Sequence, residues 1–470
     1  MKEYLVFFVH RHLDFRFPEL DALLTMQSLV PEDCYTRELN PLSSPLVHVK
    51  LPSEQHAKFL SQRGILVKGV YEMWGHGQTY DELVTSVKAY AEKDIFVSDE
   101  SLSWKIQVDA FGLKLSMEEQ TARREKFRHV LPFAGPVAMK NPALTFLILE
   151  DIGVDQQKTE PDRIFFLRAL AGGEKNRGRG GARDLVDMQT LKRREYIGPT
   201  SMDAEMALIM CNMALVQPGS LVIDPFVGTG SVLVPCTTFG GICFGTDIDS
   251  RVLHGKDGKT IKSNFDQYNL RVPDLIRADN SRSPLRCPHY FDAVVCDPPY
   301  GIRAGARKSG RREGPPENST AVQPSPQLAT DGPVPTKTVK PKYGPRHIPE
   351  EWLENHIPAT QPYAAEDVMR DLLEFAAKNL RVGGRVVYLL PTTYDYTDAD
   401  LPTHPQLRVV ANSEERLTSK YARRLITMVK TVELQGTTSN LDDGFKSDFS
   451  FAKLREKIIA SNKKPKTSTD

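Results

Sequence analysis

Val294-Val-Cys-Asp-Pro-Pro-Tyr-Gly-Ile-Arg-Ala304 is the stretch that decides which fold we expect. The apolar run from Ala293 to Cys296 predicts a buried strand, and the prolines after it cannot donate to a ladder, so the strand must stop at Asp297. In open α/β sheets, ligands bind in the crevice at the carboxyl ends of the strands. We therefore expect the Asp297 carboxylate, the Pro298 carbonyl and the Tyr300 ring to face one such crevice.

The strands that we expect upstream of this stretch also end in carboxylates. Their sequences are Ser220 to Ile223 before Asp224, Ile242 to Gly245 before Asp247, and Leu275 to Ala278 before Asp279. Four acidic strand ends on one side of a parallel sheet are hard to explain as packing. A carboxylate at the first of these ends is suited to receive an ammonium group, so the pattern predicts a ligand site.

A glycine-containing loop, Asp224-Pro-Phe-Val-Gly-Thr-Gly230, separates the first of these strands from the apolar helix start at Ser231. Strand, glycine loop and helix suit a cofactor that approaches the backbone closely, because a Cβ would collide with it. The loop is neither a G-x-G-x-x-G fingerprint nor a phosphate loop with Lys-Ser/Thr. Asp247 follows at close to the roughly 20-residue spacing at which an acid meets ribose hydroxyls, and Asp279 is placed to contact an adenine edge.

Composition sets the class of the protein. With 61 basic and 60 acidic residues in 470, any site for a polyanion must be a local patch. The six cysteines include no C-x-x-C pair, so we expect reduced thiols and no zinc site of the chain's own. No segment approaches the roughly 18 apolar residues of a spanning helix. We therefore expect a soluble, cytoplasmic protein that does not bind a membrane.

The chain is expected to divide into four parts. These are an N-terminal α+β region over residues 1–170, a basic Gly/Arg-rich linker over 171–195, an α/β domain over 196–435 with a disordered insertion at 308–346, and a polar tail over 436–470.

Basic side chains that we predict to contact nucleic acid occur in three places. They are Arg123, Arg124 and Lys140 in the first region, Arg177, Arg179 and Arg183 near the linker, and Arg303 after the Asp-Pro-Pro-Tyr strand end. A solvated helix face is the alternative for the first group, and a plain domain connection for the second. A linker that faces a polyanion does both, since guanidinium groups match phosphate oxygens.

The Asp224–Gly230 loop, paired with Asp297–Tyr300, resembles the S-adenosylmethionine-dependent amino-group methyltransferases. The fuller strings Gly198-Pro-Thr-Ser-Met-Asp203 and Asp297–Gly305 are similar to the THUMP-domain tRNA methyltransferases that modify the guanosine at position ten on its N2 atom. The similarity is strongest to the catalytic subunit of the eukaryotic enzymes. It covers about residues 190 to 432, and it is looser over the first 170 residues.

This resemblance implies a Rossmann-like methyltransferase domain behind a THUMP-containing tRNA-binding region. Carried over position by position, it implies a cofactor site made of Asp224, Pro225, Phe226, Gly228, Thr229, Gly230, Asp247 and Asp279. It assigns Asp297, Pro298 and Tyr300 to the target base. It also implies a tRNA substrate and a heterodimer with a small zinc-binding activator protein, which nothing else in the sequence indicates.

Two alternatives stay open at this point. One is a related amino-methyltransferase that acts on adenine N6 or on protein glutamine, although many of these carry Asn where this chain has Asp297. The other is an inactive RNA-binding subunit that keeps the fold, against which the intact Asp224, Gly228 and Asp247 argue.

Overall fold

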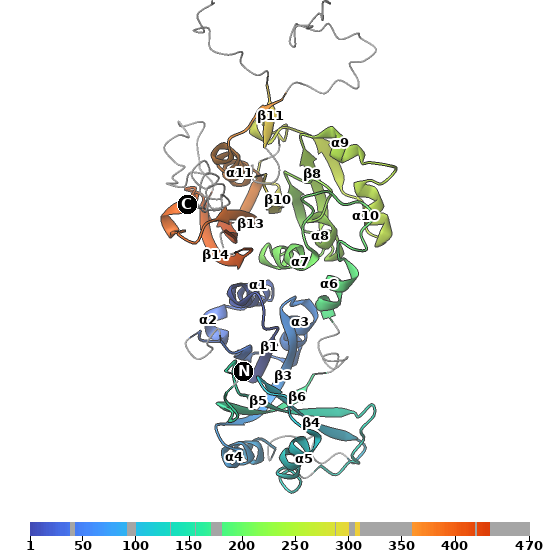
Figure 1. Ribbon diagram of the computed structural model, residues 1–470, viewed down its shortest axis with the longest axis vertical. Coiled ribbons are helices and arrows are strands. Elements are labelled where there is room, and N and C mark those ends of the chain that lie inside the picture. Colours follow the sequence, from blue (N-terminus) through green and yellow to red (C-terminus); the bar gives the residue numbers. More distant parts are fainter. Residues whose placement is uncertain are drawn as a thin grey trace, which may run out of the picture.

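The computed structural model describes residues 1–37, 43–91, 100–131, 133–155, 157–170, 181–286, 288–299, 306–310, 360–418 and 421–432. Within these residues the chain forms two bodies, each of helices packed on a sheet, which Figure 1 shows one above the other along the long axis. The first is built on a six-stranded sheet and the second on a seven-stranded sheet. No helix in these ranges is long and apolar enough to cross a membrane.

The first body has the strand order β2-β1-β3-β6-β5-β4. The strands are β1 (Lys2–Phe8), β2 (Leu46–Leu51), β3 (Val67–Gly77), β4 (Trp104–Phe111), β5 (Leu144–Asp151) and β6 (Arg163–Ala169). The helices are α1 (Arg16–Met26), α2 (Pro31–Cys34), α3 (Glu54–Arg63), α4 (Tyr80–Ala91) and α5 (Met117–Glu125), with a 3-10 turn η1 (Leu13–Phe15). Only β4 and β5 pair in parallel. The α+β prediction is confirmed, although β6 was not predicted.

The second body has the strand order β14-β15-β13-β10-β7-β8-β9. The strands are β7 (Leu221–Asp224), β8 (Ile242–Asp247), β9 (Asp274–Arg277), β10 (Phe291–Cys296), β13 (Leu380–Thr392), β14 (Leu407–Arg416) and β15 (Ala422–Lys430). The helices are α6 (Asp184–Met188), α7 (Ala204–Met213), α8 (Leu233–Thr238), α9 (Ser250–His254), α10 (Ile261–Gln267) and α11 (Ala365–Asn379). Short 3-10 turns are η3 (Gly181–Arg183), η4 (Asn280–Arg282) and η6 (Asp398–Asp400).

Strand β10 lies in the middle of this sheet, parallel to β7 on one side and to β13 on the other. Its residues 293–296 are fully buried, as the apolar run predicts. Strands β8 and β9 continue in sequence on the far side of β7, so the order of the strands reverses between β7 and β10. Ligands of open α/β sheets bind at such a switch point. Val294 pairs with Ile223, so Asp224 and Asp297 leave the sheet at the same edge.

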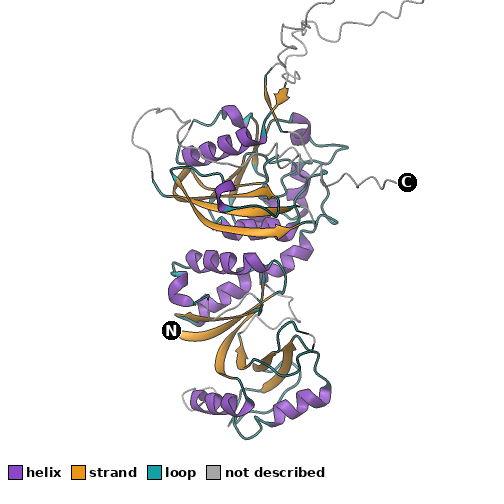
Figure 2. Cartoon of the chain, turned by 60° about the vertical axis from the view of Figure 1, so that its left-hand side comes forward, coloured by secondary structure: helices purple, strands orange, loops and turns teal. Residues whose placement is uncertain are grey.

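The two bodies share a hydrophobic core. One continuous cluster of buried side chains contains Leu23 of α1 and Leu60 of α3, and also Met210 of α7 and Val295 of β10. Helix α1 packs directly against α7, and Figure 2 shows this helical layer between the two sheets. All ten residues of α7 are buried, because the sheet covers one side of it and the first body covers the other.

Three predicted boundaries differ from the structure or lie outside it. The expected linker over 171–195 contains η3 and α6 in its second half, and residues 171–180 lie outside the described ranges. The expected insertion begins at Lys308, but Lys308 belongs to β11 (Arg307–Ser309), which pairs with β12 (Thr360–Pro362). Residues 311–359 and the expected tail over 436–470 are not described.

Candidate active site

Asp224 ends β7 with its side chain almost fully buried, at 2% exposure for the residue. Its Oδ1 accepts a hydrogen bond from the Phe226 N–H at 2.9 Å, which turns the chain into the glycine loop. Burial, and then the charges of Asp247 and Asp297, raise the pKa of Asp224 well above its usual value. Among the described residues Asp224 forms no ion pair, so the site favours a ligand that brings positive charge.

Asp247 ends β8 and ties the next strand to the glycine loop. Its Oδ2 accepts from the Gly228 N–H at 3.0 Å, and its Oδ1 accepts from the Asp249 N–H at 2.9 Å. Burial raises the pKa of Asp247 despite these hydrogen bonds. Each carboxylate oxygen keeps a further lone pair, so Asp247 can still accept from hydroxyl groups such as those of a ribose.

The glycine loop has the backbone that its sequence predicts. Gly228 and Gly230 have φ values of +50° and +77°, which other residues adopt only with strain. A Cβ on Gly230 would lie 3.0 Å from the Ile261 side chain. A Cβ on Gly228 would meet nothing closer than the Phe226 carbonyl at 3.9 Å, so the space in front of Gly228 is open. This space adjoins Asp247, whose Oδ2 accepts from the Gly228 N–H.

Side chains from outside the glycine loop also hold it in place, and we did not predict these side chains from the sequence. The Thr229 hydroxyl bonds the Ser201 hydroxyl at 2.7 Å. Asn264 of α10 is fully buried and donates to the carbonyls of Thr229 at 3.2 Å and of Tyr196 at 2.8 Å. It also accepts from the Tyr196 N–H at 2.8 Å. The sequence signal that could have identified Asn264 is its position on the same helical face as the apolar Ile261.

Asp279 follows β9 and is surrounded differently from what we expected. Its Oδ1 accepts from the N–H and hydroxyl of Ser281 at 3.0 and 2.7 Å, and its Oδ2 accepts from the Ser309 N–H at 2.6 Å. Although burial acts in the opposite direction, these hydrogen bonds hold the pKa of Asp279 below its usual value. Asp279 therefore fixes η4 and β11 beside the site. Its contact with adenine stays a prediction.

Asp297 and Pro298 come directly after β10, Asp297 half-buried and Pro298 buried. The charge of Asp297 contributes to the raised pKa of Asp224 and of the buried Cys296 thiol, for both of which burial is the larger cause. The structure thus brings Asp224, Asp247 and Asp297 to one edge of the sheet. Tyr300, as well as the basic Arg177, Arg179 and Arg303, lies outside the described residues.

Phe226 links the loop to the segment that follows the Asp-Pro-Pro-Tyr strand end. Its partly buried ring packs against a small buried cluster made of Ala306, Tyr363 and Val368. The Tyr363 N–H donates to the Ala306 carbonyl at 2.9 Å, which joins the two ends of the region that the insertion interrupts. The remaining loop residues, Pro225 and Thr229, are buried within the same turn.

The described residues contain no group of three or more His, Cys, Asp or Glu side chains that could hold a metal ion. Five of the cysteines, Cys34, Cys211, Cys236, Cys243 and Cys296, are free thiols and buried. The sixth, Cys287, lies outside the described ranges.

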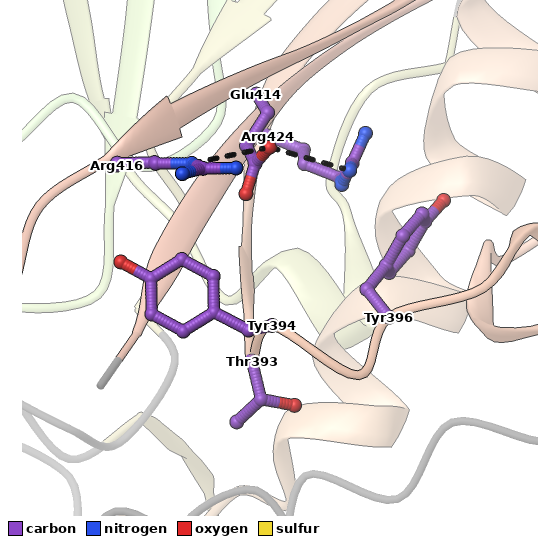
Figure 3. A pocket seen from close by; sticks show the side chains of 6 residues that line it. All are labelled: Thr393, Tyr394, Tyr396, Glu414, Arg416 and Arg424. Atoms are coloured by element: carbon purple, nitrogen blue, oxygen red, sulfur yellow. Dashed lines mark ion pairs between the residues drawn. The ribbon is translucent and has the colours of Figure 1, made fainter. Parts of the chain in front are cut away.

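A separate cavity of about 520 Å³ lies at the same edge of the sheet and was not foreseen from the sequence. We name it the Tyr394 cavity, and Figure 3 shows the six residues that line it, Thr393, Tyr394, Tyr396, Glu414, Arg416 and Arg424. The residues come from the loop after β13 and from the paired strands β14 and β15.

The three basic side chains of the first body that we predicted to contact nucleic acid differ in their exposure and in their partners. The Arg123 guanidinium donates to the buried Glu150 at 2.7 Å, and its side chain is only 20% exposed. Arg124 is partly exposed and Lys140 is exposed. Arg123 is therefore already paired with a carboxylate inside the first body, whereas Lys140 is exposed to solvent.

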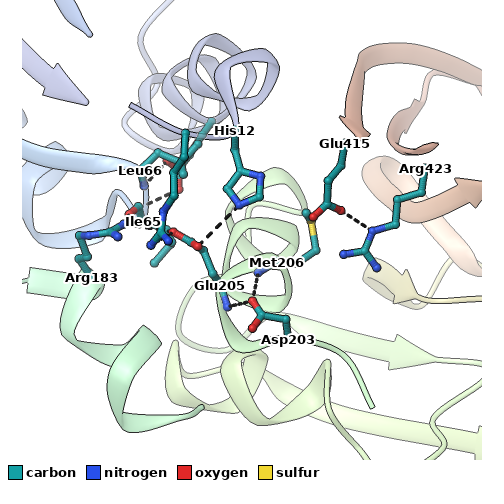
Figure 4. Close-up of polar contacts among 11 residues, drawn as sticks. His12, Ile65, Leu66, Arg183, Asp203, Glu205, Met206, Glu415 and Arg423 are labelled. Atoms are coloured by element: carbon teal, nitrogen blue, oxygen red, sulfur yellow. Dashed lines mark hydrogen bonds and ion pairs between the residues drawn. The ribbon is translucent and has the colours of Figure 1, made fainter. Parts of the chain in front are cut away.

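Arg183 lies between the two bodies. Its Nη1 donates to the Ile65 carbonyl at 2.8 Å and to Glu205 of α7 at 3.2 Å, as Figure 4 shows. Glu205 also pairs with Arg11 at 2.8 Å and lies 3.6 Å from His12. The side chain of Arg183 is 17% exposed, so its contacts within the protein leave little of it for RNA.

Two domain families match this chain. The family described as Tmrp11 THUMP N-terminal domain matches residues 2–175, which is the first body. The family described as RMKL-like, methyltransferase domain matches residues 192–312, which contain the glycine loop and the Asp-Pro-Pro-Tyr strand end.

Whole proteins match over nearly the full length. The tRNA (guanine(10)-N(2))-methyltransferase TRMT11 of Mus musculus is 36% identical over 456 residues, which cover 93% of this chain and 89% of the mouse protein. The protein of the same name from Dictyostelium discoideum is 34% identical over 458 residues and covers 94% of this chain and 84% of its own. The crystal structure of TrmN from Thermus thermophilus has a TM-score of 0.39 at 15% identity, covers 91% of this chain and 99% of that one, and supports no further conclusion.

Proposed function

The chain belongs to the family of TRMT11 tRNA (guanine(10)-N(2))-methyltransferases, and from this premise we propose that it transfers a methyl group from S-adenosylmethionine to the exocyclic N2 amine of guanosine ten in tRNA. The observation that carries the proposal is the convergence of Asp224, Asp247 and Asp297 at the switch point of the sheet. One half of this edge suits a cationic nucleoside and the other half suits an amino group.

The residues present fit S-adenosylmethionine, which supplies the methyl group when it is bound. The cofactor carries an ammonium and a sulfonium group, and Asp224 is a buried carboxylate whose pKa is raised by burial and by the charges of Asp247 and Asp297. The open space in front of Gly228, beside Asp247, suits the ribose. Pro225, Phe226, Thr229 and Gly230 complete the turn that would hold the cofactor, and we keep Asp279 as the candidate for its adenine edge.

The target amine is a weak nucleophile, because its lone pair is delocalised into the guanine ring. The Asp297 carboxylate and the Pro298 carbonyl can each accept one N–H of the amine and so point its lone pair away from the ring plane. Asp297 Oδ can also take the proton that the amine gives up. Orientation of this kind is worth effective molarities of about 10⁵ M or more. Stacking on Tyr300, which stays a prediction, would offset the few kcal/mol that it costs to unstack the base.

The first body supports tRNA as the substrate, since it matches a THUMP N-terminal domain. Of the side chains there that we predicted to contact nucleic acid, Lys140 is exposed and Arg124 is partly exposed. We also propose a small zinc-binding activator protein as the partner in a heterodimer. The support for this partner is the family resemblance alone.

The decisive experiment replaces Asp297 by alanine in the full-length chain. We expect loss of N2-methylguanosine formation by at least about a hundredfold, because one of the two acceptors that orient the amine is gone. Mass spectrometry of nucleosides from treated tRNA gives the readout, while tRNA affinity should stay within a few-fold. Asp266→Ala is the matched control, because that carboxylate is exposed on α10.

Normal turnover by the Asp297→Ala protein would overturn the assignment of the site. Methylation of adenine or of protein glutamine by the unmodified chain, with tRNA guanosine untouched, would instead favour the related amino-methyltransferases. Failure of the unmodified chain to bind S-adenosylhomocysteine would favour the inactive RNA-binding subunit.

A further inference from the structure

The Tyr394 cavity lies close to the place where the target base must enter. Strand β13 is parallel to β10 with Tyr388 opposite Cys296, so the loop after Thr392 leaves the sheet at the same edge as Asp297. Adjacent strands are about 4.8 Å apart, so β15 lies roughly 10 Å from β10 along the sheet. The cavity is therefore a neighbour of the candidate active site and is built from different residues.

The cavity also lies toward the first body. Strand β14 is the edge strand of the sheet, and its Ser413 hydroxyl and Glu414 N–H both donate to Asp14 of η1 at 3.1 Å. An RNA that is held by the first body and reaches Asp297 has this edge available on its way. The position alone does not select a ligand, but it makes the RNA substrate the first candidate.

Two aromatic rings give the cavity a surface for stacking. Tyr394 is 44% exposed, and its hydroxyl donates to the Thr418 carbonyl. The Tyr396 hydroxyl accepts from Asn412 at 3.0 Å. Each ring is anchored by its polar end, so its orientation is set before a ligand arrives. Aromatic side chains of this kind bind the unstacked bases of RNA.

Two arginines supply the charge. The Arg416 guanidinium lies 5.6 Å from the centre of the Tyr394 ring, and that of Arg424 lies 4.1 Å from the centre of the Tyr396 ring. Glu414 stands between them, 3.7 Å from Arg416 and 4.0 Å from Arg424. Two guanidinium groups and one carboxylate leave the lining with one net positive charge, which suits a single phosphate.

The arginines are not saturated by these contacts. Arg416 has a side chain that is 75% exposed, and its ion pair with Glu414 is long, so it exchanges readily for a phosphate. The Nε of Arg424 is buried and has no hydrogen-bond partner among the described residues. Its Nη1 donates to Asn412 at 3.2 Å, so the Arg424 side chain is held in place beside the Tyr396 ring.

The size and the polarity of the cavity favour a nucleotide over a protein as its ligand. A cavity of about 520 Å³ falls within the roughly 300–1,000 Å³ that is usual for small-molecule sites. Protein interfaces are centred on apolar side chains from which charged residues are depleted, whereas three of the six lining residues are charged.

We infer that the Tyr394 cavity binds an unstacked nucleotide of the tRNA beside the target guanosine, with its base against Tyr394 and its phosphate on Arg416. This inference rests on the proposed function and adds to it a second nucleotide site. Both residues are positioning residues, because they hold the substrate and do not touch the reacting amine.

The test uses steady-state methylation of whole tRNA by the full-length chain together with any subunit that co-purifies with it. For Tyr394→Ala and Arg416→Ala we expect KM for tRNA to rise about tenfold, which corresponds to the loss of one stacking or phosphate contact. The affinity for S-adenosylhomocysteine should not change, and kcat should stay within about twofold. Tyr394→Phe should keep most of the affinity because it keeps the ring.

Arg408→Ala is the matched control, since Arg408 is exposed on β14 at the end away from the cavity. The dependence of tRNA binding on salt should weaken by about one phosphate contact in Arg416→Ala and stay the same in Arg408→Ala. Equal melting temperatures of the variants would show that folding is intact.

The two proposals fail in distinguishable ways. If the unmodified chain methylates tRNA and the Tyr394→Ala and Arg416→Ala proteins keep its KM for tRNA, the nucleotide site is wrong while the enzyme assignment stands. If these variants instead lose a co-purifying subunit and keep their affinity for tRNA, the cavity is a protein contact and the inference is also overturned. An unmodified chain without activity on tRNA overturns the proposed function itself.

Discussion

At the scale of single residues, the burial of Asp224 suits it to bind a cation and at the same time lowers the stability of the folded protein. A buried carboxylate close to two others is costly to ionise, and its pKa is raised accordingly. A group whose pKa is raised by folding contributes stability below its unfolded pKa, and this contribution is lost as the pH rises through the folded pKa. At neutral pH, Asp224 therefore destabilises the ligand-free protein.

The Asp224→Asn substitution should separate these two effects. The amide keeps an acceptor for the Phe226 N–H and carries no charge. We expect the cofactor-free variant to melt roughly 2–4 °C higher than the unmodified protein near pH 7.5, which corresponds to about 1 kcal/mol, and the difference to vanish near pH 4. Thermal melting over this pH range, with and without S-adenosylhomocysteine, gives the measurement.

The same variant should lose the stabilisation that S-adenosylhomocysteine confers, because the carboxylate that we propose to receive the ammonium group is gone. Asp266→Asn, an exposed carboxylate on α10, is the control and should behave like the unmodified protein. An unchanged shift of the melting temperature by the ligand in Asp224→Asn would show that Asp224 does not hold the cofactor.

At the scale of elements, the short helix α10 supports the conformation of the glycine loop. Its Asn264 is fully buried and bonds the backbone of the loop at Thr229 and the backbone of the segment before α7 at Tyr196. Ile261, one turn earlier on the same face, fills the space beside Gly230. The helix thus couples the segment before α7 to the cofactor site.

Replacing Asn264 by leucine should expose this coupling. Three backbone groups lose their partner in the interior, and each such loss costs about 1–3 kcal/mol. We expect lower stability in urea, and a weaker affinity for S-adenosylhomocysteine because the loop is less constrained. Lys262→Ala on the exposed face of the same helix is the control. An Asn264→Leu protein with unchanged cofactor affinity would limit Asn264 to a role in folding.

The strands of the candidate site were predictable from an apolar run that ends in an acid, whereas β6 was missed. The strands before Asp224 and Asp297 have a sharp stop in the sequence, because a proline follows each of these residues. Strand β6 has only a short apolar run between two arginines, which periodicity alone does not assign. Strand β13 runs through Gly383 and Gly384, because β10 pairs with it on both sides of an irregularity between Phe291 and Ala293.

At the scale of the whole molecule, buried polar groups fix the two bodies to one another. Glu19 of α1 is fully buried and accepts from the N–H groups of Ile65 and Leu66, both at 2.9 Å. Asn212 of α7 donates to Glu19 at 2.7 Å and accepts from Arg63 at 2.6 Å. Because Asn212 belongs to the second body and the other residues to the first, the contact allows few relative orientations.

The Asn212→Leu substitution removes this connection while it keeps the size of the side chain. Glu19 and Arg63 then lose a partner in the interior, at a cost of about 1–3 kcal/mol. We expect the affinity for tRNA and kcat/KM on tRNA to fall several-fold, because the two bodies no longer hold one orientation. The affinity for S-adenosylhomocysteine should change little.

Filter binding of tRNA and calorimetry of the cofactor check this expectation. Gln217→Leu is the control, because Gln217 is exposed just beyond α7. If Asn212→Leu weakens both affinities to the same extent, the network serves the methyltransferase body and not the relation between the bodies.

The sequence by itself determined the strand ends, the glycine loop and the acids of the candidate site, because these depend on backbone chemistry within a few residues. Proline stops a ladder and glycine permits a positive φ wherever they occur. The tertiary structure decided which charges meet. It turned Arg123 toward Glu150 and Arg183 toward Glu205, and it formed the Tyr394 cavity from three separate segments. Contacts between residues far apart in the chain depend on how the sheets and helices pack, and no local pattern records them.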